Sequence, residues 1–578
     1  MSKNKTILIG CIAFPIFLII AFFIGFFSTR NTMGVTAKVP SDAWLHVNPM
    51  AMISDYSEIM PMKWFGSSMN SAEDMARKIR AAATDSRIKG LLIEPHYIQV
   101  NMPALGEIGK ALEEFKKSGK PMVAYGEMMG QGDYLLATYA KDIYLEPSAS
   151  AGLLLEGISA NVLFYKDLFA KLGIKMHVMQ IGEFKGAGEP YSQNALSEGT
   201  KKNLEAVLSD RYAILKNLIA TRRKLSPEKV SELFEQRPDF FLSAASAKTW
   251  GLIDFPMSRL DMLAKLNITD EQLLKISAYK AEAPKIQKDK VAVVYLSGEI
   301  TANTGNQFSD QATINSAKVE RIIEDIREDK AVKAIVLRIN SPGGSALESE
   351  KIYQQLIKLK KDYPIVVSMG GMAASGGYYI SCAGDYMMAD NAAITGSIGV
   401  IMMIPETEGL GKKLGLNSQT LRFGKYAGAF NMFEKYDPAL LQSLKESSEG
   451  TYTEFKNRVM TARKFEAAYL DSVAEGRVFS AEDAKNNRLI DEIGDLQAAI
   501  AKAADLVNLK TYSVANFPEK VSFFSLLQDS ELFQMRQLLN FNFDPAQALE
   551  KELQNLPAAY EWHYLMPHKF EDYEERQF

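Results

Sequence analysis

Residues 243–254 read SAASAKTWGLID, and residues 480–491 repeat this stretch as SAEDAKNNRLID. Seven of the twelve positions are identical without a gap. Earlier in each half of the chain, Lys171–Gly173 recurs as Lys413–Gly415. Matches that keep their order along a chain are the signature of an internal repeat. The sequence therefore predicts two copies of one domain of roughly 230 residues.

A polar, proline-containing linker at 281–290 separates the two copies. In the second copy, short apolar runs alternate with stretches of helical periodicity. The runs cover 291–296, 334–339 and 365–369, and the expected helices cover 319–327 and 346–359. This alternation predicts an α/β fold in which helices cover a largely parallel sheet.

The predicted domains follow from the repeat and the linker. Residues 31–284 are expected to form the first copy, and residues 285–516 the second. Residues 517–578 match neither copy. Because apolar residues are followed there by helical periodicity, we expect a helical packing or assembly segment.

A charge-free apolar run occupies Ile7–Phe27, near the amino terminus. As a helix, a run of this length spans about 30 Å, the thickness of the hydrocarbon core of a bilayer. The apolar region of a cleaved signal peptide is shorter, about 7–15 residues, and ends at small residues. We therefore expect residues 1–30 to hold a short tail and one retained transmembrane anchor. Basic residues flank the run on both sides, so the positive-inside rule leaves its orientation open.

Charge and composition exclude several classes of function. The chain has 578 residues, with 66 Lys and Arg against 70 Asp and Glu, a net charge of -4. Such a balance argues against nucleic acid as a partner, because no excess of cations exists to neutralise phosphates. The two cysteines and five scattered histidines form no metal-binding pattern. We expect neither a metal nor a cofactor.

Two glycine-rich turns at strand ends stand out in the second copy. The first, Asn340–Ser345, reads NSPGGS, and its glycine amides can hold a developing oxyanion. The second, Gly370–Tyr378, reads GGMAASGGY and places Ser375 at an expected helix start between small neighbours. A serine presented in this way exposes its hydroxyl, with the amide of the next residue beside it. Ser375 is therefore the candidate nucleophile.

The base that such a serine needs is suggested by the first copy. Its GEFKGAG, at 182–188, aligns with GKYAGAF, at 424–430, so Lys185 corresponds to Ala427. Ser375 in turn corresponds to Gln131, so each copy lacks what the other keeps. This pattern predicts one site per chain, shared between the copies. A lysine serves as a base only when burial lowers its pKa from about 10.4 towards 7–8.

These motifs resemble signal peptide peptidase A, or protease IV, in its long, two-repeat, membrane-anchored form. Thr395–Gly399, which reads TGSIG, belongs to the same resemblance. It implies tandem domains like those of Clp protease and crotonase, carrying a serine endopeptidase with a Ser–Lys dyad and no cofactor. Such enzymes form a bowl-shaped homotetramer. They lie in the bacterial inner membrane, face the periplasm and cut hydrophobic peptides such as signal-peptide remnants.

The resemblance also implies a role for each site residue. Ser375 is the nucleophile, Lys185 is the base, and Ser397 orients the lysine amine; the first-copy counterpart of Ser397 falls close to Leu153. The amides of Gly344 and Gly376 form the oxyanion hole.

Two alternatives remain from the residues themselves. The first is a serine hydrolase that uses a histidine of the tail, His563 or His568, as its base. The second is a membrane-anchored scaffold that uses a crotonase-like fold for binding and catalyses nothing.

Overall fold

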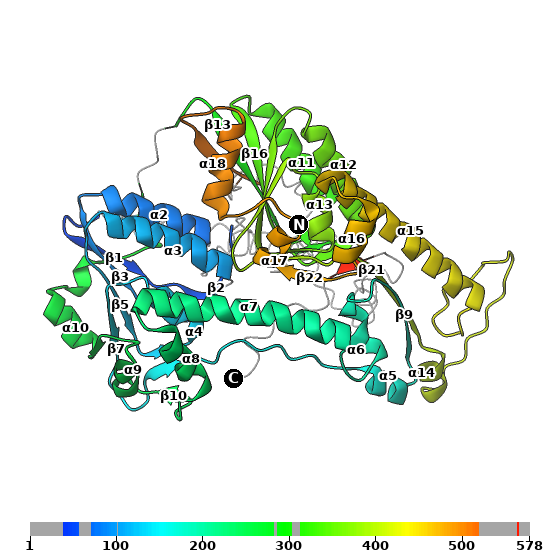
Figure 1. Cartoon of the computed structure of the whole chain (residues 1–578), viewed down its shortest axis with the longest axis horizontal. Coiled ribbons are helices and arrows are strands. Elements are labelled where there is room, and N and C mark those ends of the chain that lie inside the picture. Colours follow the sequence, from blue (N-terminus) through cyan, green and yellow to red (C-terminus); the bar gives the residue numbers. More distant parts are fainter. Residues whose placement is uncertain are drawn as a thin grey trace, which may run out of the picture.

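The computed structural model describes residues 39–56, 71–100, 102–281, 286–302, 313–519 and 563–565. Figure 1 shows two α/β units, the first coloured blue to green and the second green to orange. No helix in these residues is long and apolar enough to cross a membrane. The predicted anchor at 7–27 lies outside the described residues.

The first unit is built on a parallel sheet in the order β11-β7-β5-β3-β1-β12. Its strands are β1 (Ala43–Val47), β3 (Ile88–Ile93), β5 (Met122–Gly126), β7 (Asp142–Leu145), β11 (Phe255–Pro256) and β12 (Leu273–Lys275). Apolar side chains of α2 (Ala72–Thr84) and α3 (Met102–Lys117) join a core on one face of the sheet, and those of α10 (Arg259–Leu266) join a core on the other.

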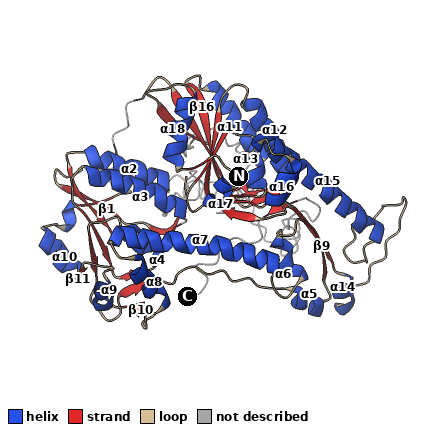
Figure 2. Ribbon diagram, viewed as in Figure 1, coloured by secondary structure: helices blue, strands red, loops and turns tan. Residues whose placement is uncertain are grey.

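The second unit repeats this plan with the order β22-β20-β18-β16-β13-β24. All these strands pair in parallel except β20 and β22. The strands are β13 (Lys290–Ser297), β16 (Val332–Ser341), β18 (Ile365–Ala374), β20 (Ile394–Gly396), β22 (Val478–Ser480) and β24 (Ser513–Phe517), with β19 (Tyr386–Ala389) and β23 (Glu492–Ile493) at one side. The α/β fold with mostly parallel sheets is therefore confirmed (Figure 2).

The pattern of apolar residues in the sequence explains the strands and helices of the second unit. The runs predicted at 291–296, 334–339 and 365–369 lie within β13, β16 and β18, because parallel strands buried on both faces are almost wholly apolar. The two predicted helices are α11 (Ser316–Glu328) and α12 (Ala346–Leu359). Helix α12 begins where the Ser345 hydroxyl accepts a hydrogen bond from the Glu348 amide, the capping contact expected of this spacing. Helix α18 (Leu496–Leu506) packs on the opposite face.

Two long helices show the repeat most clearly. Helices α7 (Glu198–Arg223) and α15 (Pro438–Arg463) both have 26 residues, and each ends at a lysine in the left-handed conformation, Lys224 and Lys464. Helix α6 (Glu189–Ser192) has no counterpart among the described helices, but eight other helices form four corresponding pairs. They are α4 (Gln131–Ala137) with α13 (Gly376–Ser381), α5 (Lys166–Leu172) with α14 (Glu408–Lys413), α8 (Pro227–Glu235) with α16 (Ala467–Val473), and α9 (Ala244–Trp250) with α17 (Ala481–Asn486).

A third sheet joins the two units. Its order is β15-β14-β17-β25-β21-β9, so β9 (Lys175–Ile181) of the first copy pairs antiparallel with β21 (Val400–Glu406) of the second. The smaller strands are β14 (Glu299–Ile300), β15 (Thr313–Ile314), β17 (Gly343–Ser345) and β25 (His563–Leu565). In the predicted segment 517–578, the structure describes 517–519 and 563–565, and the latter form a strand that adds to the open edges of β17 and β21. The helical prediction for the rest of the segment stays a prediction.

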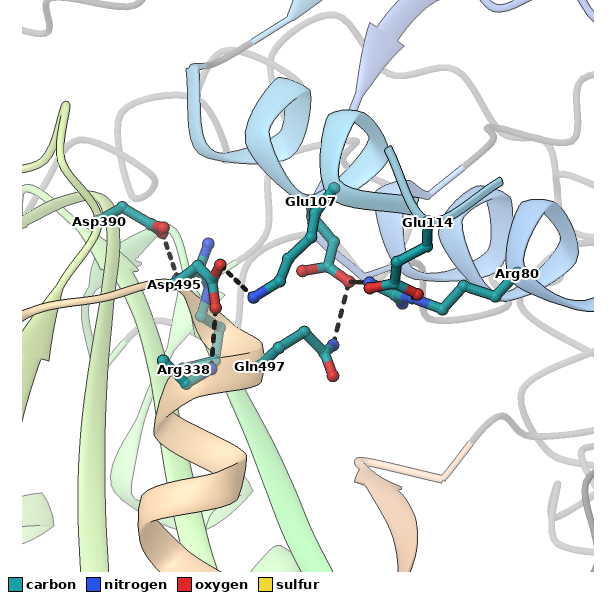
Figure 3. A network of polar contacts seen from close by, with 9 residues as sticks. Arg80, Glu107, Glu114, Arg338, Asp390, Asp495 and Gln497 are labelled. Atoms are coloured by element: carbon teal, nitrogen blue, oxygen red, sulfur yellow. Dashed lines mark hydrogen bonds and ion pairs between the residues drawn. The ribbon is translucent and has the colours of Figure 1, made fainter. Parts of the chain in front are cut away.

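Polar contacts also tie the first copy to the second (Figure 3). The Lys110 ammonium of α3 lies 2.6 Å from the Asp495 carboxylate, which precedes α18. The Gln497 amide donates to Glu107 at 3.1 Å, and Glu107 also pairs with Arg80 of α2 at 3.0 Å. These contacts hold α3 against α18 at the junction of the two units.

A buried arginine extends this junction into the second sheet. Arg338 of β16 is 2% exposed, and its guanidinium contacts Asp390 at 2.6 Å and Asp55 of the first copy at 3.0 Å. Burial raises the pKa of Asp390 to about 6, although the neighbouring guanidinium acts in the opposite direction. The same strand leads directly into the glycine turn of the site.

Candidate active site

Ser375 stands between β18 and α13, where the strand turns sharply into the helix. Its backbone has φ 56° and ψ -115°, a strained conformation for a residue with a side chain. The turn is close to its neighbours: a methyl group on Gly377 would lie 2.8 Å from the Ser341 carbonyl oxygen, and one on Gly376 would lie 3.2 Å from Gly343. This is the strand-to-helix geometry that presents a nucleophile.

Lys185 comes from the first copy, in the loop after β9. Its amine lies 2.7 Å from the Ser375 hydroxyl oxygen, 2.9 Å from the Ser397 hydroxyl oxygen and 2.9 Å from the Ser397 carbonyl oxygen. All three residues have no exposed surface. The structure therefore brings together the three side chains that the sequence singles out, from segments far apart along the chain.

The electrostatic environment favours the neutral amine. Burial lowers the pKa of Lys185 well below its usual value, and none of the described carboxylates opposes that effect. A neutral amine has two N–H donors and one lone pair. The two oxygens of Ser397 can accept the N–H groups, which leaves the lone pair directed at the Ser375 hydroxyl.

The segment that carries Ser397 is hydrogen-bonded to the turn that carries Ser375. The Ser375 amide donates to the Gly396 carbonyl at 2.8 Å, and the Ser397 amide donates to the Arg477 carbonyl at 2.7 Å. Ser397 itself has a φ of 53°. In the first copy, strands β8 (Gly152–Leu154) and β10 (Phe241–Leu242) pair antiparallel, as β20 and β22 do in the second copy. Aligning the two registers makes Leu155, not Leu153, the first-copy counterpart of Ser397.

A turn at 474–477 positions the lysine, and sequence analysis missed it. The Phe184 amide donates to the Glu475 carbonyl at 2.8 Å. Gly476 has a φ of +77°, and a methyl group there would lie 2.6 Å from the Lys185 backbone nitrogen. The Arg477 guanidinium lies 4.1 Å from the centre of the Phe184 ring. Glu475 and Gly476 match Pro238 and Asp239 of the first copy. This difference between the copies is the sequence signal that could have pointed to the turn.

The predicted oxyanion groups lie on either side of the turn. Gly344, in β17, has a φ of +146°, and any side chain there would collide with the Ile300 carbonyl. The Gly376 amide is in the first turn of α13, where helix amides have no intrahelical partner. Strand β25 runs antiparallel to β17, with Tyr564 opposite Gly344. The edge of β17 thus accepts an extended segment of chain.

The first copy holds no equivalent site. Gln131, the counterpart of Ser375, exchanges hydrogen bonds with Gly157: its side-chain amide donates at 3.1 Å, and its side-chain oxygen accepts from the Gly157 amide at 3.0 Å. Ala427, the counterpart of Lys185, has no amine. Within the described ranges, no group of three or more His, Cys, Asp or Glu is placed to hold a metal.

Two of the described histidines are paired with carboxylates. His46 pairs with Glu94, and His177 pairs with Glu406. The backbone of His563 lies in β25, opposite Ser345 and Ile401, and His568 is outside the described residues.

The chain matches two protein families, and the broader match indicates the class of protein. Residues 296–396 match the Clp protease family, so the second copy has the scaffold of a serine peptidase. Residues 114–273 and 357–510 match Peptidase family S49, one stretch in each copy. The chain belongs to peptidase family S49 and is a serine peptidase.

Three curated relatives support this assignment. Protease 4 of Haemophilus influenzae is 34% identical over 84% of this chain and 82% of its own length. Protease 4 of Salmonella typhi is 33% identical, over 81% of this chain and 77% of its own length. The chloroplastic serine protease SPPA of Arabidopsis thaliana is 28% identical, over 76% of this chain and 66% of its own length.

Proposed function

We propose that this peptidase cuts peptide bonds with a Ser–Lys dyad formed by Ser375 and Lys185. The observation that carries the proposal is the fully buried contact of 2.7 Å between the lysine amine and the serine hydroxyl. Because burial lowers the pKa of Lys185, the amine is available as a general base. Ser397 positions that amine through its two oxygens.

The reaction proceeds through an acyl-enzyme. Lys185 takes the proton of the Ser375 hydroxyl as its oxygen attacks the peptide carbonyl, and the Gly344 and Gly376 amides stabilise the oxyanion. The lysine then gives the proton to the leaving amine. Water, deprotonated in the same way, hydrolyses the ester and restores the serine.

The proposed substrates are hydrophobic peptides such as cleaved signal peptides. Two considerations support this class: a relative from Enterococcus faecium carries the name signal peptide peptidase SppA, and an apolar run at 7–27 would place the site near a bilayer. We further propose a single-pass protein of the bacterial inner membrane whose catalytic part faces the periplasm. The peptidase would act there as a homotetramer.

The test uses two single replacements and a matched control. Ser375→Ala and Lys185→Ala should each abolish hydrolysis of an apolar reporter peptide, and the circular dichroism spectrum should not change. Ser381→Ala is the control, because Ser381 is an equally buried serine of α13 whose hydroxyl donates only to the Gly377 carbonyl. Substantial activity in purified Lys185→Ala would eliminate the dyad.

Labelling distinguishes the alternatives. A fluorophosphonate should modify Ser375 in the unchanged protein and in His563→Ala, but not in Lys185→Ala. Loss of labelling in His563→Ala alone would favour a histidine base, and no labelling of any variant would favour a scaffold without activity.

A further inference from the structure

The side chain of Arg477 lies beside the dyad, and the proposed mechanism gives it no role. Its guanidinium is 4.1 Å from the centre of the ring of Phe184, the residue that directly precedes Lys185. Its backbone carbonyl accepts a hydrogen bond from the Ser397 amide at 2.7 Å. One residue of the second copy therefore contacts both the segment that carries the lysine and the segment that orients its amine.

The guanidinium of Arg477 has no anionic partner in the described part of the chain. Its Nε is buried there without a hydrogen bond, and no ion pair joins the group to a carboxylate. Glu475, the nearest carboxylate along the chain, accepts from the Tyr452 hydroxyl at 3.0 Å and from the Glu183 amide at 3.2 Å instead. Buried donors without an acceptor are rare in folded proteins, because leaving one unpaired is costly. The guanidinium is therefore ready for an acceptor that the described residues do not supply.

Other arginines of the chain show what a purely structural guanidinium does. Arg463 makes two hydrogen bonds with Asp491, at 2.9 Å and 3.0 Å. Its first-copy counterpart, Arg223, makes the same two with Asp254, at 3.0 Å and 3.1 Å. An arginine that serves the fold is thus paired with a carboxylate, and the pair is present in both copies.

Arg477 differs from those arginines in the repeat as well as in its contacts. Its first-copy counterpart is Phe240, in the copy that has no serine nucleophile. Ser375 and its counterpart Gln131 show the same one-sided pattern. Because the fold of the first copy does without this guanidinium, the repeat associates Arg477 with the site.

The chemistry of the group and its place in the site indicate its ligand. A guanidinium matches a carboxylate, because its parallel N–H groups can donate to both oxygens. A hydrophobic peptide carries no acidic side chain, but its C-terminal end is a carboxylate. In the proposed reaction Lys185 gives its proton to the leaving amine, so the C-terminal part of the peptide departs on the side of the lysine. Arg477 belongs to that side, since it covers the ring next to Lys185.

We propose that Arg477 binds the C-terminal carboxylate of the substrate peptide. The peptidase then selects peptides that have already been cut close to the bond that it hydrolyses, and it disfavours the same sequence within a longer chain. This inference rests on the proposed function and adds to it the feature by which a peptide remnant is recognised. Arg477 is therefore assigned as a residue that determines specificity.

Peptide binding tests the proposal without hydrolysis. The full chain carrying Ser375→Ala is solubilised in detergent and titrated against a fluorescent apolar peptide that ends either in a free carboxylate or in an amide. Fluorescence anisotropy should show the free acid binding about tenfold more tightly or better, the effect expected of hydrogen bonds to a charged group. Equal dissociation constants would overturn the proposal, and this comparison needs no change at Arg477.

Variants then assign the preference to one side chain. Adding Arg477→Met should make the two dissociation constants equal, and Arg477→Lys should keep part of the preference, because a lysine supplies a charge without the paired N–H groups. Arg488→Met is the matched control: the Arg488 guanidinium also lies over a ring, 4.3 Å from the centre of Tyr469, but has no contact with the site segments. A full preference in Arg477→Met, or its loss in Arg488→Met, would overturn the proposal.

Kinetics separate substrate binding from support of the lysine loop. In protein with Ser375 intact, Arg477→Met should lower kcat/KM for the free acid about tenfold more than for the amide, mainly through KM. If Arg477 only held Phe184 in place, the variant would lower kcat for both peptides alike and leave their ratio unchanged. That result would also overturn the proposal.

The two proposals fail in different experiments. Activity in Lys185→Ala would eliminate the dyad but would leave the preference for the free acid measured in the Ser375→Ala protein. Equal binding of acid and amide would eliminate the carboxylate site but would leave the loss of activity in Ser375→Ala and Lys185→Ala.

Discussion

At the scale of single residues, the burial that supports Lys185 as the proposed base has a cost in stability. A buried ammonium loses its hydration, and no carboxylate in the described part of the chain compensates Lys185 for that loss. The folded protein therefore holds the amine neutral at a pH where the unfolded chain would protonate it. The same burial that supports the proposed role of the amine as a base makes folding less favourable.

This cost predicts the pH dependence of a Lys185→Met variant. Between the lowered pKa of Lys185 and about 10.4, the unfolded state binds one more proton than the folded state, so stability rises with pH by about 1.4 kcal/mol per unit. A methionine side chain does not titrate, so the replacement would remove that slope. We expect the free energy of unfolding of the variant, minus that of the unchanged protein, to fall as the pH rises from about 8 to about 10 in urea titrations. A constant difference would contradict a neutral Lys185.

The contact between the candidate residues Ser375 and Lys185 was predictable because the repeat allows two copies of one domain to be compared within one chain. The residues that match Ser375 and Lys185 in the other copy cannot do the same chemistry. This difference between the copies is visible in the single sequence. Gly476 was not predictable, because its role depends on a positive φ and on close approach to the Lys185 backbone. Neither property is encoded in residue type alone, since many glycines have neither.

At the scale of elements, the turn at 474–477 determines where the lysine sits. Gly476→Ala should therefore lower kcat by roughly 100-fold, the effect expected of a shift of about 1 Å in a catalytic group. Gly119→Ala is the matched control: its φ of +76° is nearly the same, but nothing lies within 4 Å of the added methyl group. Both variants should lose about 1–2 kcal/mol of stability from backbone strain. Only Gly476→Ala should lose activity, and equal rates in the two would refute the positioning role.

The buried arginine of β16 predicts a pH-dependent loss of stability. Arg338→Met should cost about 3–5 kcal/mol at about pH 8, because it leaves buried carboxylates without their cation. Burial already raises the pKa of Asp390 to about 6, and loss of the guanidinium would raise it further. The folded variant then binds more protons than the unfolded chain, so the loss should be smaller at about pH 5. Urea titrations at the two pH values measure this difference.

A second arginine serves as the control for that experiment. Arg80 also pairs with two carboxylates, Glu107 and Glu114, but its side chain is 27% exposed. Arg80→Met should cost no more than about 1 kcal/mol, because solvent screens such pairs. A loss in Arg338→Met that did not depend on pH would contradict the role given to Asp390.

The parallel strands could be predicted from sequence, but the sheet between the copies could not. The run at 334–339 is apolar except for Arg338, because both faces of its strand are buried. Lys175–Ile181 is mixed in polarity, and its partner β21 belongs to the other copy, so local periodicity does not identify the pairing. The strand in the tail was missed for the same reason, since its partners β17 and β21 are distant in sequence.

At the scale of the whole molecule, duplication has left one complete site and one incomplete one. The site inside the chain combines Lys185 of the first copy with Ser375 of the second. The matching positions of the repeat hold Ala427 and Gln131, whose side chains supply neither an amine base nor a hydroxyl. The number of active sites should therefore equal the number of chains, not the number of domain copies.

Mixing inactive copies tests that relation. Ser375→Ala and Lys185→Ala copies, dissociated and reassembled together, should show no hydrolysis, because each intact Lys185 faces an altered Ser375 in its own chain and each intact Ser375 faces an altered Lys185. Recovered activity would mean that the loop carrying Lys185 reaches the serine of another chain. Mixtures of unchanged and Ser375→Ala copies serve as the control. Their rate should fall in proportion to the fraction of unchanged chains, because a site contained within one chain does not depend on its neighbour's chemistry.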